Sequence, residues 1–162
     1  MIYGMVNNIN INHKMITQEI PNFLASGTLP PGIHTTTWEE FKNRYGINHK
    51  RKLQLRGLEK AIKEFEKAGC TKVYVDGSFV TNKKNPGDFD ALYDLEEVND
   101  EIIDFRLLDA TPTGREKQKK YYEGEFFPAY IKAHPDGTIY LDYFQRDKKT
   151  NEPKGIVKIE LR

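Results

Sequence analysis

The sequence predicts an α/β (α+β) domain, in which helices flank a mixed β-sheet. A long amphipathic pattern at residues 49–68 predicts a helix, because apolar residues recur every three to four positions from Leu55 to Phe65 and Gly69 follows its end. The β-branched and aromatic run at 72–75 predicts a short buried strand directly after it. Apolar and polar residues then alternate at 88–93 and again at 157–161, which is typical of strands.

Composition places the chain among globular proteins with one domain. Its 162 residues are 38% hydrophobic and 30% charged, and 25 Lys and Arg nearly balance 24 Asp and Glu, for a net charge of +1. That charge does not demand a nucleic-acid partner. Cys70 is the only cysteine and no apolar run approaches the roughly 20 residues of a membrane span, so we expect a cytoplasmic protein without a membrane partner.

Two parts are expected along the chain, an extended N-terminal arm at residues 1–35 and a single domain at 36–162. Residues 1–18 are rich in Asn and Ile without a helical period, so they are either a short edge strand or a mobile arm. The prolines and glycines of residues 20–34 exclude a continuous helix there.

Two helices open the domain. The first is expected at 37–45, where Thr37 is the N-cap and Glu40 completes a capping box. The second is the pattern at 49–68, whose polar face interleaves lysines and arginines with glutamates and is mostly a solvated surface. Arg51 and Arg56, in its first half, are candidates for phosphate contacts.

The later part of the chain is expected to supply a basic helix and two more strands. Residues 115–122 form the helix, and its cations are either a solvated face or a patch for nucleotide phosphates or a nucleic-acid acceptor: Arg115, Lys117, Lys119 and Lys120. The turn at 134–137 leads into an expected strand at 138–144, which would pair with 157–161. Asp142 stands alone there among aromatic and aliphatic neighbours, and such an acid must be paired, protonated or metal-bound if it is buried.

Most of the candidate binding and catalytic residues lie between residues 76 and 94. Gly77 and Ser78 form a turn after the first strand, and Gly77 allows a backbone to approach a phosphate closely while the Ser78 hydroxyl donates to it. Asp88 and Asp90 are two apart on a strand, so both carboxylates project from one face. Paired carboxylates of this kind suit Mg²⁺, which takes oxygen ligands.

This stretch resembles the nucleotidyltransferase superfamily, in which a Gly-Ser turn is followed by an Asp-x-Asp pair on the next strand. The resemblance implies that Asp88 and Asp90 are catalytic metal ligands and that Gly77 and Ser78 hold the nucleotide. It also implies a third carboxylate from a later strand, for which Asp142 is the first candidate and Asp94 or Asp104 are the others. Minimal members often carry Arg-Gly after the turn; this chain has lysines instead, and Lys83 and Lys84 are expected to contact phosphate.

The chain is also similar to small, poorly characterised bacterial and phage nucleotidyltransferase-like proteins. This similarity rests on four segments: 29–32, 77–81, 86–90 and 154–157. It suggests a toxin–antitoxin or phage-defence setting, with a possible partner protein.

The expected function is therefore a Mg²⁺-dependent (or Mn²⁺-dependent) nucleotidyltransferase that uses a nucleoside triphosphate. Its acceptor stays open among protein, tRNA and small molecule. Two alternatives from other classes also stay open. One is a catalytically inactive nucleotide-binding or antitoxin-like interaction module, and the other is a nucleotide sensor.

Overall fold

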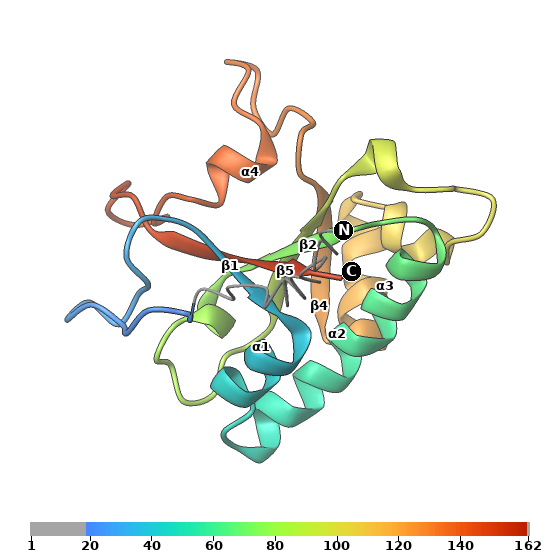
Figure 1. Cartoon of the computed structure of the whole chain (residues 1–162). Coiled ribbons are helices and arrows are strands. Elements are labelled where there is room, and N and C mark those ends of the chain that lie inside the picture. The colour runs from blue at the N-terminus through green and yellow to red at the C-terminus, as the bar shows by residue number, and fades with distance from the viewer. Residues whose placement is uncertain (1–18, 162) are drawn as a thin grey trace, which may run out of the picture.

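A five-stranded mixed β-sheet forms the centre of the fold in a computed structural model that describes residues 19–161 (Figure 1). The strands lie in the order β1-β5-β2-β3-β4. Their bounds are β1 Gly32–Thr37, β2 Lys72–Asp76, β3 Phe89–Tyr93, β4 Gly124–Pro128 and β5 Gly155–Glu160. β5 is parallel to β1 and antiparallel to β2, and β3 is antiparallel to β2 and parallel to β4. The predicted mixed sheet with flanking helices is confirmed.

Side-chain caps define where the first helices begin. The helices are α1 Trp38–Tyr45, α2 His49–Lys67, α3 Pro112–Tyr122 and the single turn α4 Tyr140–Tyr143. The Thr37 hydroxyl accepts a hydrogen bond from the Glu40 N–H at 3.2 Å, so the predicted N-cap is confirmed. The Asn48 side chain caps α2 in the same way, accepting from the Arg51 N–H at 2.9 Å.

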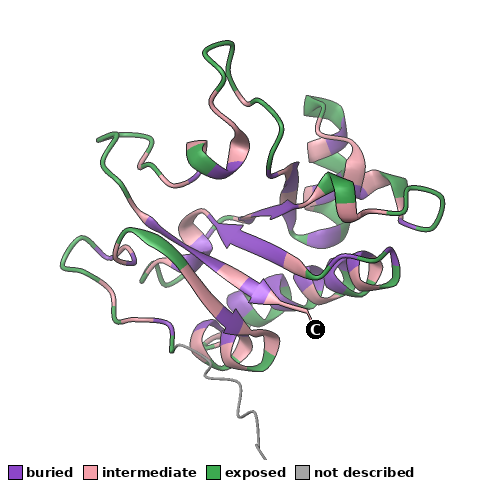
Figure 2. Ribbon diagram, turned by 45° about the horizontal axis from the view of Figure 1, so that its top comes forward, coloured by how far each residue is buried: buried purple, intermediate pink, exposed green. Residues whose placement is uncertain are grey.

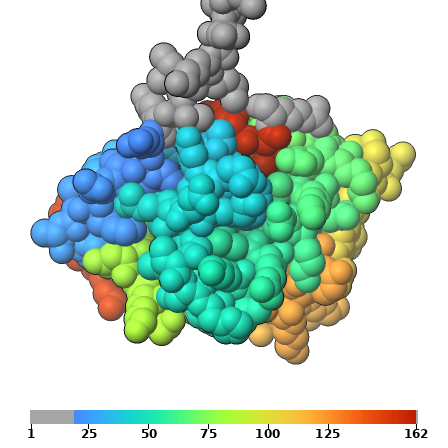
Figure 3. All heavy atoms as spheres, turned by 60° about the horizontal axis from the view of Figure 1, so that its bottom comes forward, coloured from blue at the N-terminus to red at the C-terminus, as the bar shows by residue number. Residues whose placement is uncertain are grey.

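Alternation along the strands produces a core on each face of the sheet. Val73, Val75 and Phe89 belong to the larger core, against which α1 and α2 pack. Figure 3 views that side of the molecule, where the cyan and teal atoms of α1 and α2 cover the middle. Tyr74 and Leu92 point the other way, into a smaller core with Leu141 and Phe144, which belong to α4 and the residue after it. Figure 2 shows buried residues running through the central strands between these two layers.

The prediction of a strand at 138–144 is wrong. The segment forms α4 because Leu141 and Phe144, three residues apart, both pack on the sheet from one side of a helical turn. The expected pairing of 157–161 with this segment is therefore also wrong, since β5 lies between β1 and β2. The turn at 134–137 is present, but only a single bridge, from Lys132 to Ile139, flanks it.

Two strands of the sheet are additional to those expected. β1 spans the expected boundary between arm and domain at residue 35, and Leu29, just before it, is buried in the larger core. β4 follows α3 directly and forms the opposite edge of the sheet. The expectation for residues 1–18 lies outside the described residues.

Candidate active site

The Gly-Ser turn follows the end of β2 and packs against the Asp-x-Asp strand. Gly77 has a φ of +80°, in the region that favours glycine, and a 3₁₀ turn begins at Ser78. A Cβ atom on Gly77 would lie 2.8 Å from Asp90 Oδ2, which is closer than such contacts occur. Only glycine therefore allows this backbone to lie beside the Asp90 carboxylate.

Two polar side chains of α2 and the side chain of its N-cap residue hold the loop between the turn and β3. The buried Arg51 guanidinium donates to the carbonyl oxygens of Phe79, Thr81 and Lys83 at 2.6–2.9 Å. Gln54 donates to the Pro86 carbonyl, and Asn48 donates to that of Lys84. Burial lowers the pKa of Arg51.

The two arginines expected at phosphate therefore lie elsewhere. Arg51 is enclosed in the loop contacts just described, with 1% of its surface exposed, so it is a loop anchor and not a phosphate ligand. Arg56 is exposed and lines a cavity beside α1, together with Trp38 and Glu59.

Four carboxyl groups lie on the α4 side of the sheet or beside it. Asp76 is the register partner of Asp90 across the antiparallel β2–β3 pair, and Asp90 is the register partner of Glu125 across the parallel β3–β4 pair. Asp88 lies just before β3 and lines the same cavity as Asp90. We refer to Asp76, Asp88, Asp90 and Glu125 as the acidic cluster.

Burial and mutual repulsion govern the charge of this cluster. Asp76 is fully buried, and neither of its carboxylate oxygens has a well-formed hydrogen bond. The Lys154 ammonium lies 3.4 Å from Asp76 Oδ2, yet loss of solvent dominates and raises the Asp76 pKa to about 7. Burial, followed by the charge of Asp88, raises the pKa of Asp90 to about 6.

α3 supplies cations to the other end of the acidic cluster. Lys119 Nζ lies 2.8 Å from Glu125 and 3.7 Å from Asp88, and Arg115 lies 3.6 Å from Glu125. The hydrogen bond to Glu125 raises the pKa of Lys119. The basic run expected at 115–120 is therefore divided, because Arg115 and Lys119 face the acids while Lys117 and Lys120 do not take part in these contacts.

A cavity of about 540 Å³ brings the Gly-Ser turn and the Asp-x-Asp pair together with further cations. Gly77, Ser78, Asp88, Asp90 and Lys83 all line it. The 145–154 loop contributes four cations that the sequence analysis did not single out: Arg146, Lys148, Lys149 and Lys154. The Asp147 carboxylate shapes this loop by accepting from the backbone N–H groups of Lys149 and Thr150 at 2.9 Å.

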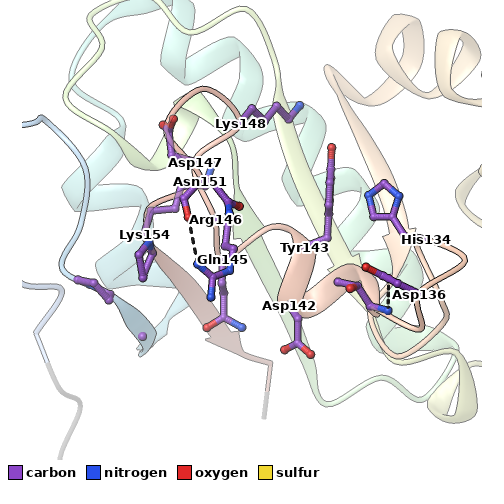
Figure 4. Close-up of a pocket in the computed structure, with 14 residues that line it drawn as sticks. His134, Asp136, Asp142, Tyr143, Gln145, Arg146, Asp147, Lys148, Asn151 and Lys154 are labelled. Atoms are coloured by element: carbon purple, nitrogen blue, oxygen red, sulfur yellow. Dashed lines mark hydrogen bonds between the residues drawn. The ribbon is translucent and has the colours of Figure 1, made fainter.

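Asp142 lies apart from the other expected acids. It is exposed on α4 and lines a neighbouring cavity of about 890 Å³, shown in Figure 4. There its carboxylate points away from α4 on the opposite side from the Tyr143 ring. The premise that Asp142 is a buried acid on a strand is wrong, because the segment turns into a helix and leaves that side chain outside the smaller core.

The remaining expected residues are also placed. Asp94 lies 3.6 Å from Lys72, and Asp104 pairs with Arg106, so neither joins the acidic cluster. Lys84 is exposed and is not among the residues that line the cavity of the Gly-Ser turn.

Asp76 and Glu125 are the acids that sequence reasoning missed. Asp76 directly precedes the glycine of the turn, which masks its period-two spacing from Tyr74 and hence its place on the same face of β2. Glu125 carries no local signal, because only the register of β4 with β3 brings it beside Asp90.

A search of residues 19–161 finds no group of three or more His, Cys, Asp or Glu side chains arranged to hold a metal ion. No helix within the same residues is long and apolar enough to cross a bilayer.

Fold and site together define an α+β protein with one buried and three partly buried acids beside a Gly-Ser turn and a cation-lined cavity. The chain belongs to DUF6932, a family of unknown function whose model matches residues 21–160. No curated protein and no solved structure matches the chain.

Proposed function

We propose that this protein is a Mg²⁺- or Mn²⁺-dependent nucleotidyltransferase that moves a nucleoside monophosphate from a triphosphate to an acceptor. One observation carries the proposal: the Gly77-Ser78 turn, the Asp88 and Asp90 carboxylates and several cations line a single cavity. A triphosphate needs both kinds of group, since cations balance its charge and carboxylates hold the metal that accompanies it. A cytoplasmic toxin–antitoxin or phage-defence setting remains part of this proposal.

The carboxylates present fit such a metal. Mg²⁺ sites commonly use only one or two protein carboxylates, and substrate phosphates and waters complete the shell, so three preformed protein ligands are not required. Asp88 and Asp90, which line the cavity, would be those ligands. Glu125 is ion-paired with Lys119 outside the cavity lining, but as the register partner of Asp90 it is our candidate for a third carboxylate in place of Asp142. Burial and, after it, the charge of Asp88 raise the pKa of Asp90, and a cation would relieve the repulsion between the two carboxylates. When bound, the ion supplies charge neutralisation at the transferring phosphate and favours ionisation of an attacking hydroxyl.

The chain's own groups would position the substrate. The Ser78 hydroxyl and the backbone beside Gly77 can donate to phosphate oxygens at the end of β2. Lys83, Lys148 and Lys149 line the same cavity and would balance the triphosphate charge. Lys154 stays beside the buried Asp76 and offsets part of its charge.

Labelled nucleotides test the proposal. Each α-³²P-labelled nucleoside triphosphate is incubated with the protein, Mg²⁺ or Mn²⁺ and cell lysate, and labelled RNA, protein and small molecules are then separated. We expect transfer to one class of acceptor, and no transfer by the Asp88→Asn/Asp90→Asn double variant. Asp142→Asn is the matched control and should transfer normally. Nucleotide binding without any product would instead favour the sensor or the inactive module.

A further inference from the structure

A second group of cations converges on Tyr121, at the surface of α3. The Arg106 guanidinium lies 3.7 Å and Lys60 Nζ lies 4.1 Å from the centre of its ring, and Lys60 also donates to the Tyr121 carbonyl at 2.8 Å. Lys117 and Lys120 join Arg106 and Tyr121 in lining a hollow of about 270 Å³. We refer to Lys60, Arg106, Lys117, Lys120 and Tyr121 as the Tyr121 patch.

The three lysines of the Tyr121 patch have no ion-pair partner among the described residues, whereas Arg106 is paired with Asp104. Within the described residues, no carboxylate lies within 4.0 Å of the ammonium groups of Lys60, Lys117 or Lys120. Asp109 faces Lys117 and offsets part of its charge from beyond ion-pair distance, while its carboxylate accepts from the Thr111 backbone and hydroxyl. Since the whole chain has a net charge of only +1, this concentration of cations is local.

Like charges held around one ring repel each other, and a bound anion removes that cost. Several separate cations suit a polymer of phosphates better than one small anion, because each cation can neutralise a different phosphate. The contacts with Tyr121 also fix Lys60 and Arg106 in place before any ligand binds.

We infer that the Tyr121 patch binds the phosphate backbone of a nucleic acid. α3 connects this patch to the acidic cluster, because Lys119 and Arg115 of the same helix contact Glu125. A nucleic acid bound at the patch would thus lie on the other side of α3 from the acidic cluster. We infer that it would be the acceptor. The acceptor role depends on the proposed transferase activity, whereas the binding does not.

Fluorescence anisotropy with a labelled 20-nucleotide single-stranded RNA tests the inference in a salt series. Three phosphate contacts, from Lys60, Lys117 and Lys120, should give a slope of log Kd against log salt of ~2.1, at roughly 0.7 per contact. The Lys117→Gln/Lys120→Gln variant should lower the slope to ~0.7 and weaken binding about 25-fold at 0.1 M salt, since the same slope makes each contact worth roughly fivefold there.

The matched control is Lys50→Gln/Lys52→Gln. It removes two exposed lysines from the other end of α2, roughly 12–15 Å from Lys60 at 1.5 Å per residue, and should leave RNA affinity unchanged. An equal loss in both double variants, or no loss in the first, would overturn the inference. So would a poly-glutamate chain that competes as well as unlabelled RNA.

The two proposals fail separately. Asp88→Asn/Asp90→Asn should bind the RNA as the wild type does but transfer no nucleotide to it. If RNA binding is lost only in the Lys117→Gln/Lys120→Gln variant and no nucleotide is transferred by any form, the patch stands and the proposed enzyme does not.

Discussion

The buried Asp76 carboxyl should make the folded protein less stable as the pH rises. Its pKa is 3.8 in ordinary surroundings and about 7 in the folded chain. Between these values the unfolded chain has released the proton that the folded chain still holds, so stability falls as pH rises through this window. At ~1.36 kcal/mol per pKa unit, a rise of about three units corresponds to up to about 4 kcal/mol of lost stability above pH 7.

Replacing Asp76 by Asn removes this dependence, because the amide keeps the shape of the protonated acid without its charge. Urea unfolding followed by circular dichroism should give similar stabilities for wild type and Asp76→Asn at pH 4, and a variant more stable by about 2–4 kcal/mol at pH 8. Asp142→Asn, which removes an exposed carboxylate, should stay within ~0.5 kcal/mol of wild type at both pH values. Parallel pH profiles for wild type and Asp76→Asn would refute the reasoning.

Three further substitutions test how the site is held. Arg51→Met leaves three loop carbonyls without their donor, so it should lower the free energy of unfolding in urea by about 3 kcal/mol or more. Trypsin should also cleave this variant faster after Lys83 and Lys84. Unchanged proteolysis would show that Arg51 does not anchor the loop. Gly77→Ala forces a side chain into positive φ and against Asp90, so it should cost about 1–3 kcal/mol and weaken metal-dependent nucleotide binding measured by calorimetry. Gly87→Ala, where a Cβ meets nothing within 4 Å, is its control and should leave that binding intact. Glu125→Gln should abolish nucleotide transfer while Asp142→Asn does not, and the opposite result would restore Asp142 as the third carboxylate.

Local patterns were sufficient for the elements whose own residues determine them. Thr37 and Glu40 define the start of α1, and the apolar stripe of α2 is visible at helical spacing. β1 escaped prediction because this edge strand is rich in Thr and mostly half-exposed, so it lacks an apolar alternation. The 138–144 segment has strand-like composition, but tertiary packing of Leu141 and Phe144 determines its helical turn.

The candidate site likewise has a part that local sequence predicts and a part that it does not. Gly77, Ser78, Asp88 and Asp90 are close in sequence, and the structure brings them into one cavity. Glu125 and Lys154 reach the acids only through the register of β4 with β3 and the position of β5 beside β2, which depend on contacts distant in sequence. The third carboxylate could not be chosen from the sequence because that choice depends on strand order.

Thermal melts with Mg²⁺ and nucleoside triphosphate test the central claim, that the acidic cluster binds a metal with its nucleotide. A ligand at a hundredfold excess over its Kd stabilises the native state by about 2.7 kcal/mol, which corresponds to roughly 5–11 °C for a chain of this size. We predict a shift of this size for wild type and for Asp142→Asn, and its loss in Asp90→Asn. Neither Mg²⁺ alone nor nucleotide alone should give a shift of comparable size. A full shift in Asp90→Asn, or none in wild type with any of the four nucleotides, would contradict the account.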